Sequence, residues 1–137
     1  MPDINMKWIG GEQFLAADEA GHVVVTDSEG NGFKPTKLLL VSLVGCAGVD
    51  VVRILEKKRQ KAAAIEAEVS MHHAPDPPWC IERIDIEWVV RGRDLRVKAV
   101  TDAIRLSEDK YCSVYASLTS EIVSTVRVVD EDGSPVS

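Results

Sequence analysis

The chain has 137 residues, 45% of them hydrophobic and 28% charged, which is typical of a globular protein with one hydrophobic core. Its 16 basic and 22 acidic residues give a formal net charge of -6, and this argues against binding to a nucleic-acid backbone. Residues 1–9 lack a basic segment followed by an apolar one, so we expect no signal peptide and a cytoplasmic location.

The first 35 residues predict a small group of strands. Apolar and polar side chains alternate there, and the pair Gly10-Gly11 marks a turn between the first two strands. The strands are expected at residues 4–8, 12–16 and 23–26. Pro35 then suits the first turn of a helix, where its fixed φ and missing N–H are tolerated.

A helical pattern covers residues 36–61, and Leu38–Val52 is apolar on nearly all sides. Asp50 and Arg53 interrupt the apolar stretch, which favours a buried helix over a membrane span. A helix of about 25 residues is about 37 Å long, more than a domain of this size covers. We therefore predict a homodimer, in which a second copy of the chain covers this long buried central helix.

The second half predicts a mixture of strands and helices. Strands are expected at residues 64–69, 84–90 and 122–129, and helices from about Asp94 to Ile104 and from Asp109 to Ser120, the latter with Ser107 as its N-cap. Residues 130–137 form a polar tail. The whole, residues 1–137, is predicted to be a single α+β domain with a largely antiparallel sheet.

Cys46 is the first candidate for chemistry. Small residues flank it in Gly45-Cys46-Ala47-Gly48 and would leave its sulfur reachable, although a cysteine buried in the core fits the segment equally well. Asp50, one turn further on, would raise the pKa of the thiol, and Arg53 would offset that effect.

Cys112 lies near the predicted helix start, where the partial positive charge of a helix N-terminus stabilises a thiolate. The alternative is a core position, because Val114 and Leu118 follow at roughly helical spacing. Cys80, in a loop after two prolines, has no such setting and is interpreted as an incidental thiol.

The histidines carry no clear site. His72 and His73 are adjacent and would point to opposite sides of a strand, without partners at metal-ligand spacing, so we predict no metal. We have no mechanism for His22.

Two segments together resemble a known family. Pro35–Val52 resembles the cysteine helix of the OsmC/Ohr family of osmotically inducible and organic hydroperoxide resistance proteins, and Leu106–Val114 resembles its second cysteine motif. Gly92-Arg93-Asp94-Leu95 resembles a segment of the YhfA-like subgroup. The resemblance extends over about residues 7–129 and includes the order of the predicted strands.

The resemblance implies an OsmC-like fold, an intertwined homodimer and active sites at the interface. It implies that Cys46 is the peroxidatic thiol and Cys112 the resolving one, that organic hydroperoxides are the substrate, and that an external dithiol restores both thiols without any cofactor. A thiolate that attacks a hydroperoxide becomes a sulfenic acid, which a second thiol converts to a disulfide.

The chain departs from the family's peroxidases in the residues that activate the thiol. They use an N-terminal arginine and a glutamate before the cysteine helix, whereas here no arginine precedes Arg53, and Thr36 and Lys37 stand where the glutamate falls. Lys7, like Asp50 and Arg53, is a candidate for charge support, but it lacks the planar fork of arginine. The alternative function is a small-molecule-binding, lipid-binding or redox-sensing domain without efficient peroxidase activity.

Overall fold

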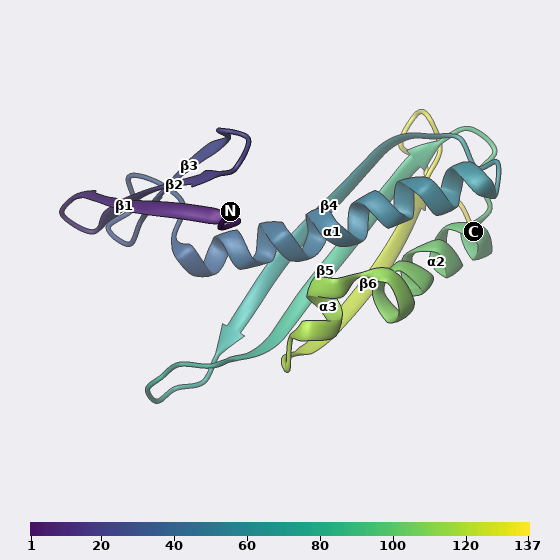
Figure 1. Cartoon of the computed structure of the whole chain (residues 1–137). Helices are drawn as coiled ribbons and strands as arrows, with labels where there is room; N and C mark the ends of the chain where they lie inside the picture. The colour runs from purple at the N-terminus through teal and green to yellow at the C-terminus, as the bar shows by residue number, and fades with distance from the viewer. The chain divides into compact units, whose positions relative to one another are not determined.

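The computed structural model describes residues 1–137, which form two compact units, Met1–Ser42 and Leu43–Ser137. The first unit contains β1 (Ile4–Gly10), β2 (Gln13–Asp18) and β3 (Val23–Asp27), joined as an antiparallel sheet in the order β1-β2-β3. Gly10 and Gly11 both adopt positive φ at the first turn, a conformation that glycine reaches without steric cost. The three predicted N-terminal strands are confirmed (Figure 1).

Helix α1 (Pro35–Lys57) begins at the predicted proline and ends four residues before the predicted Lys61. Arg59 takes a φ of 56°, the left-handed conformation that commonly ends a helix, and the Gln60 N–H closes on the Leu55 carbonyl at 2.9 Å. The length and composition of α1 would suffice to cross a membrane, but core helices of soluble proteins pass the same test.

The second unit is built on a three-stranded sheet of β4 (Ala62–His73), β5 (Ile81–Gly92) and β6 (Glu121–Val129), in the order β4-β5-β6. Strands β4 and β5 form an antiparallel hairpin, whereas β6 pairs parallel to β5 after a long crossover through α2 (Val97–Leu106). Helices α1 and α2 lie against the same face of this sheet (Figure 1). The predicted largely antiparallel α+β architecture is confirmed, with this one parallel pair.

The core of the second unit lies between this sheet face and the helices. Every second residue of β5 faces inward, and α1 contributes a stripe at a spacing of four residues. The buried residues of these two elements are Ile84, Ile86, Trp88 and Val90 of β5 and Leu43, Ala47, Val51 and Leu55 of α1. Burial of α1 is one-sided: Val49 is 51% and Val52 44% exposed in the single chain. One copy of the chain therefore covers α1 on one side only, and cover by a second copy stays a prediction.

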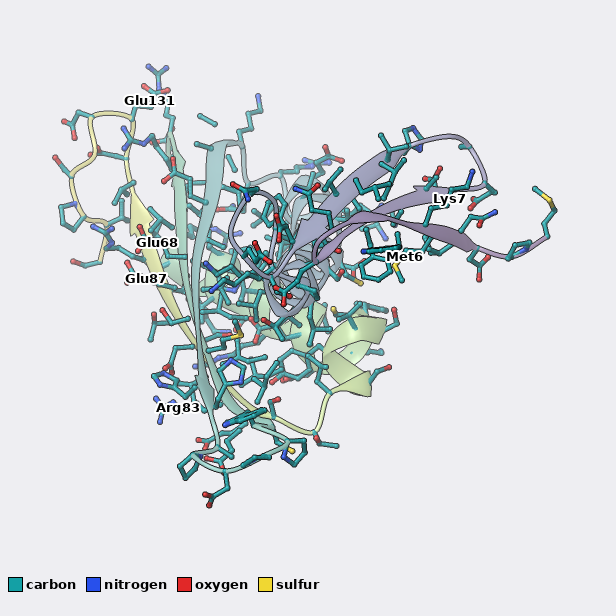
Figure 2. The ribbon with its side chains drawn as sticks, turned by 90° about the vertical axis from the view of Figure 1, so that its left-hand side faces the viewer. Met6, Lys7, Glu68, Arg83, Glu87 and Glu131 are labelled. Atoms are coloured by element: carbon teal, nitrogen blue, oxygen red, sulfur yellow. The ribbon has the colours of Figure 1, made fainter.

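The opposite face of the sheet is charged. Glu68 of β4 lies directly across from Glu87 of β5, and Figure 2 shows both, together with Arg83, on this outer side. Arg83 pairs with Asp85 at 2.8 Å, and Arg127 approaches Glu87 at 3.6 Å. This face therefore lies in solvent, and the chemistry-bearing residues lie on the helical side.

Candidate functional site

Cys46 lies on α1 in the second unit, half-buried, one position before the fully buried Ala47. A Cβ atom added at Gly45 or Gly48 would meet nothing within 4 Å, so the space beside Cys46 is open in the single chain. The sulfur therefore lies at the border between the core and an uncovered side of the helix.

Cys112 lies between the π-helical turn η1 (Ser107–Tyr111) and the short helix α3 (Ser113–Ser117). The predicted continuous helix from Asp109 to Ser120 is wrong, because the chain becomes extended at Cys112, with φ −79° and ψ 107°. Its N–H closes the turn on the Ser107 carbonyl at 2.8 Å, five residues back. Cys112 is therefore the residue before a helix, not part of its first turn.

Cys112 is 2% exposed, and its side chain caps α3. The Tyr115 N–H donates to Sγ at 3.3 Å, and Sγ lies 3.9 Å from the Leu43 carbonyl of α1. A cysteine in the place usually taken by serine or aspartate thus binds one of the free N–H groups of the helix start. The alternative prediction, that Cys112 occupies a core position, is correct in that the residue is buried.

The two sulfurs interact, and their pKa values move in opposite directions. The Val114 N–H and the Cys112 thiol lower the pKa of Cys46, with further donors from Ser113, while burial opposes them. Burial raises the pKa of Cys112, and the neighbouring Cys46 raises it further, while the Tyr115 N–H opposes this. Cys46 is thus the thiol that ionises first, and Cys112 stays protonated beside it.

The segment that carries Cys112 is tied to α1 next to Cys46. Ser107 is fully buried, and its Oγ donates to the Ala47 carbonyl at 2.8 Å. Because Ala47 follows Cys46 directly, this bond fixes the distance between the two cysteine-bearing segments.

A second anchor ties η1 to the sheet. Glu108 is only 6% exposed, and its carboxylate accepts hydrogen bonds from Trp88 Nε1 at 3.0 Å and from Ser124 Oγ at 2.7 Å. Burial raises the pKa of Glu108, and the two donors act against that rise. Sequence reasoning missed Glu108 as an anchor; the one available signal is that Trp88 lies in the predicted strand at residues 84–90, where a buried indole N–H needs a partner.

The predicted charge-supporting residues do not gather around Cys46 within the second unit. Asp50 is half-buried and Arg53 exposed, and neither makes an ion pair or a side-chain hydrogen bond in the chain. Lys7 is exposed on β1 of the first unit (Figure 2). The groups that act most on Cys46 are instead neutral donors of residues 112–114.

Of the other sequence candidates, Cys80 has no partner, and the three histidines have partners of their own. Cys80 is an exposed free thiol in the loop before β5. His72 bonds Asp85 at 2.7 Å, His73 bonds the Trp79 carbonyl at 2.9 Å, and His22 bonds Asp18 at 2.7 Å. No three His, Cys, Asp or Glu side chains are arranged to hold a metal ion.

Comparison with known proteins decides the family. Residues 28–127 match the model of the family described as OsmC-like protein. The chain belongs to the OsmC-like family. This family membership agrees with the resemblance of the two cysteine segments.

Individual relatives of this OsmC-like protein extend the match to nearly its whole length. Protein YhfA of Escherichia coli is 33% identical over 119 residues, 85% of this chain and 89% of YhfA. The structure of a hypothetical protein from Aquifex aeolicus superposes with a TM-score of 0.87 at 31% identity, over 96% of this chain and 98% of that one. An OsmC-like protein from Mycoplasma pneumoniae has a TM-score of 0.82 at 17% identity, over 93% and 96% of the two chains, and shows the shared fold.

Proposed function

We propose that this OsmC-like protein is a thiol-dependent hydroperoxide reductase in which Cys46 attacks and Cys112 resolves. The observation that carries the proposal is that a half-buried thiol of lowered pKa and a buried thiol of raised pKa act on each other's ionisation, with Oγ of Ser113, the residue after Cys112, 3.9 Å from Cys46 Sγ. A thiolate is the nucleophile in peroxide reduction, and a neighbouring protonated thiol is the group that a resolving step needs.

The proposed cycle has three steps. The Cys46 thiolate attacks the outer oxygen of a hydroperoxide ROOH, the O–O bond breaks, and the leaving alkoxide takes a proton from water to give ROH. Cys112 then displaces water from the resulting sulfenic acid, which forms a Cys46–Cys112 disulfide. An external dithiol reduces this disulfide and is itself oxidised, a cycle suited to the cytoplasm, which we propose as the location.

The surroundings of Cys46 favour organic hydroperoxides as the substrate. Val49 lies three residues after Cys46, on the same side of the helix, and is 51% exposed. An apolar substituent on the peroxide gains contact with such a surface, whereas hydrogen peroxide has no apolar part to bury.

We also propose that two copies of the chain assemble into a homodimer with active sites at the interface. Val49 and Val52 form an uncovered apolar side on α1, next to the cysteine, and a second copy would cover it. Light scattering at micromolar concentration is expected to give twice the mass of one chain; a monomeric mass would contradict this part of the proposal.

The decisive experiment is mass spectrometry after addition of one equivalent of cumene hydroperoxide. We expect a Cys46–Cys112 disulfide in the wild type, a trapped sulfenic acid in Cys112→Ser, and no oxidation in Cys46→Ser. Cys80→Ser is the matched control and is expected to behave like the wild type. Three unmodified thiols in the wild type would refute the peroxidase proposal.

A redox-sensing role is the second candidate, favoured because neutral donors rather than an arginine are the main groups that lower the pKa of Cys46. Steady-state consumption of cumene hydroperoxide with excess dithiothreitol separates the two functions. A sensor forms the same disulfide but turns over slowly, whereas a reductase continues until the hydroperoxide is consumed.

A further inference from the structure

We propose that Ser113 is a catalytic residue whose hydroxyl donates a hydrogen bond to the attacking sulfur of Cys46. This role rests on the proposed thiol chemistry and explains how the site works without the expected arginine and glutamate. Ser113 follows Cys112 directly, so the segment that brings in the resolving thiol also brings in this donor.

The geometry carries the assignment. Ser113 Oγ lies 3.9 Å from Cys46 Sγ, within the longer reach of hydrogen bonds to sulfur. The bond crosses 67 positions of sequence and joins α1 to the first residue of α3. Ser113 is exposed, so its hydroxyl has no core-packing role that would otherwise account for its position.

The Ser113 hydroxyl also has no competing acceptor in the chain. Serines in helices commonly donate back to the carbonyl four residues earlier, and Ser117 does so to the Ser113 carbonyl at 2.8 Å. For Ser113, the Cys46 sulfur is the one side-chain hydrogen-bond partner. The hydroxyl can therefore donate its hydrogen bond to the Cys46 sulfur without giving up another acceptor in the chain.

Electrostatics supports the same assignment. Hydrogen bonds to an ionised acceptor are roughly twice as strong as those between neutral groups, so this donor is worth most when Cys46 is a thiolate. Both the hydroxyl and the N–H of Ser113 lower the pKa of Cys46, alongside the Val114 N–H. The hydroxyl keeps its proton throughout: negative charge leaves sulfur for the alkoxide, which is protonated by water.

The test compares Ser113→Ala with Ser113→Thr in a Cys80→Ser background, and uses Ser117→Ala as the matched control on the same helix. The apparent pKa of Cys46 is read from the pH dependence of its alkylation by iodoacetamide and from thiolate absorbance at 240 nm. The same variants are then assayed for the rate of oxidation by cumene hydroperoxide across pH 5 to 9.

Ser113→Ala is expected to raise the apparent pKa of Cys46. At pH values below that pKa, the rates of alkylation and of oxidation should fall by about threefold to tenfold. At high pH, where Cys46 is fully ionised, little loss is expected. Threonine keeps a hydroxyl and should restore the wild-type profile. Ser113→Asp places a like charge beside the thiolate and should raise the pKa further, while an aspartate suits the first turn of a helix.

The proposal is overturned by an unchanged pKa in Ser113→Ala, or by a loss of rate that is equal at every pH, since the latter indicates a structural effect. Iodoacetamide reports on the thiolate without any peroxide chemistry. A wild type that shows the expected alkylation profile but does not react with cumene hydroperoxide would therefore refute the peroxidase function and leave the Ser113 assignment standing.

Discussion

Substitution of Trp88 by phenylalanine probes the anchor of the resolving segment. Trp88 is 2% exposed and its Nε1 donates to the buried carboxylate of Glu108 at 3.0 Å. A hydrogen bond to a charged group contributes about 1.5–3 kcal/mol, and the smaller ring adds about 1 kcal/mol of lost contact. We expect Trp88→Phe to lower the free energy of unfolding by about 2.5–4 kcal/mol near neutral pH.

The loss of unfolding free energy in Trp88→Phe is expected to depend on pH. The Trp88 N–H favours the charged form of Glu108 and opposes the rise in pKa that burial causes. Without that donor the pKa rises further, so the penalty is largest where the folded protein holds Glu108 ionised. The penalty should therefore be greater at pH 8 than at pH 5, where more of the carboxyl is protonated.

Urea denaturation followed by circular dichroism measures this difference at both pH values, at one fixed protein concentration and with excess reductant. Trp88→Phe in a Glu108→Gln background is the control and should show a smaller, pH-independent penalty. An equal loss at pH 5 and pH 8, or a loss below about 0.5 kcal/mol, would refute the view that this bond anchors the turn.

Three further substitutions test the fold. Glu108→Gln should flatten the pH dependence of stability. Because the pKa of Glu108 is raised in the folded protein, the folded wild type binds more protons than the unfolded wild type. In denaturant titrations the wild type should therefore lose stability relative to the variant as the pH rises from 5 to 8. Gly92→Ala should cost about 1–3 kcal/mol in thermal unfolding, because a Cβ there would overlap the Lys61 carbonyl oxygen; an unchanged midpoint would contradict this. Leu43→Ala should cost about 2–5 kcal/mol in urea titration because Leu43 is fully buried, and a loss below 1 kcal/mol would count against that packing.

Local patterns were sufficient to predict most of the fold. Alternation identified β5, the Gly10-Gly11 turn separated β1 from β2, and Pro35 marked the start of α1. The parallel pairing of β6 with β5 could not be predicted in this way, because it depends on where the crossover returns the chain. Long-range pairing leaves no local signal in the strand itself.

The break at Cys112 escaped prediction for a similar reason. Residues 107–120 have helical spacing, but buried bonds from Ser107 to α1 and from Glu108 to β5 and β6 hold the chain in a π-helical turn and then let it extend. These tertiary bonds override local preference. Cys46 and Cys112 were identified from their motifs, whereas the Ser113 hydroxyl became visible only through its contact with sulfur.

The sulfur of Cys112 both takes part in the proposed chemistry and caps α3, which affects how the site is studied. Serine is among the strongest helix caps, so Cys112→Ser keeps an acceptor for the Tyr115 N–H, whereas Cys112→Ala removes it. An alanine variant therefore confounds lost reactivity with a frayed helix beside Cys46. The serine variant separates the two, and a comparison of both measures what the cap alone contributes to the shape of the site.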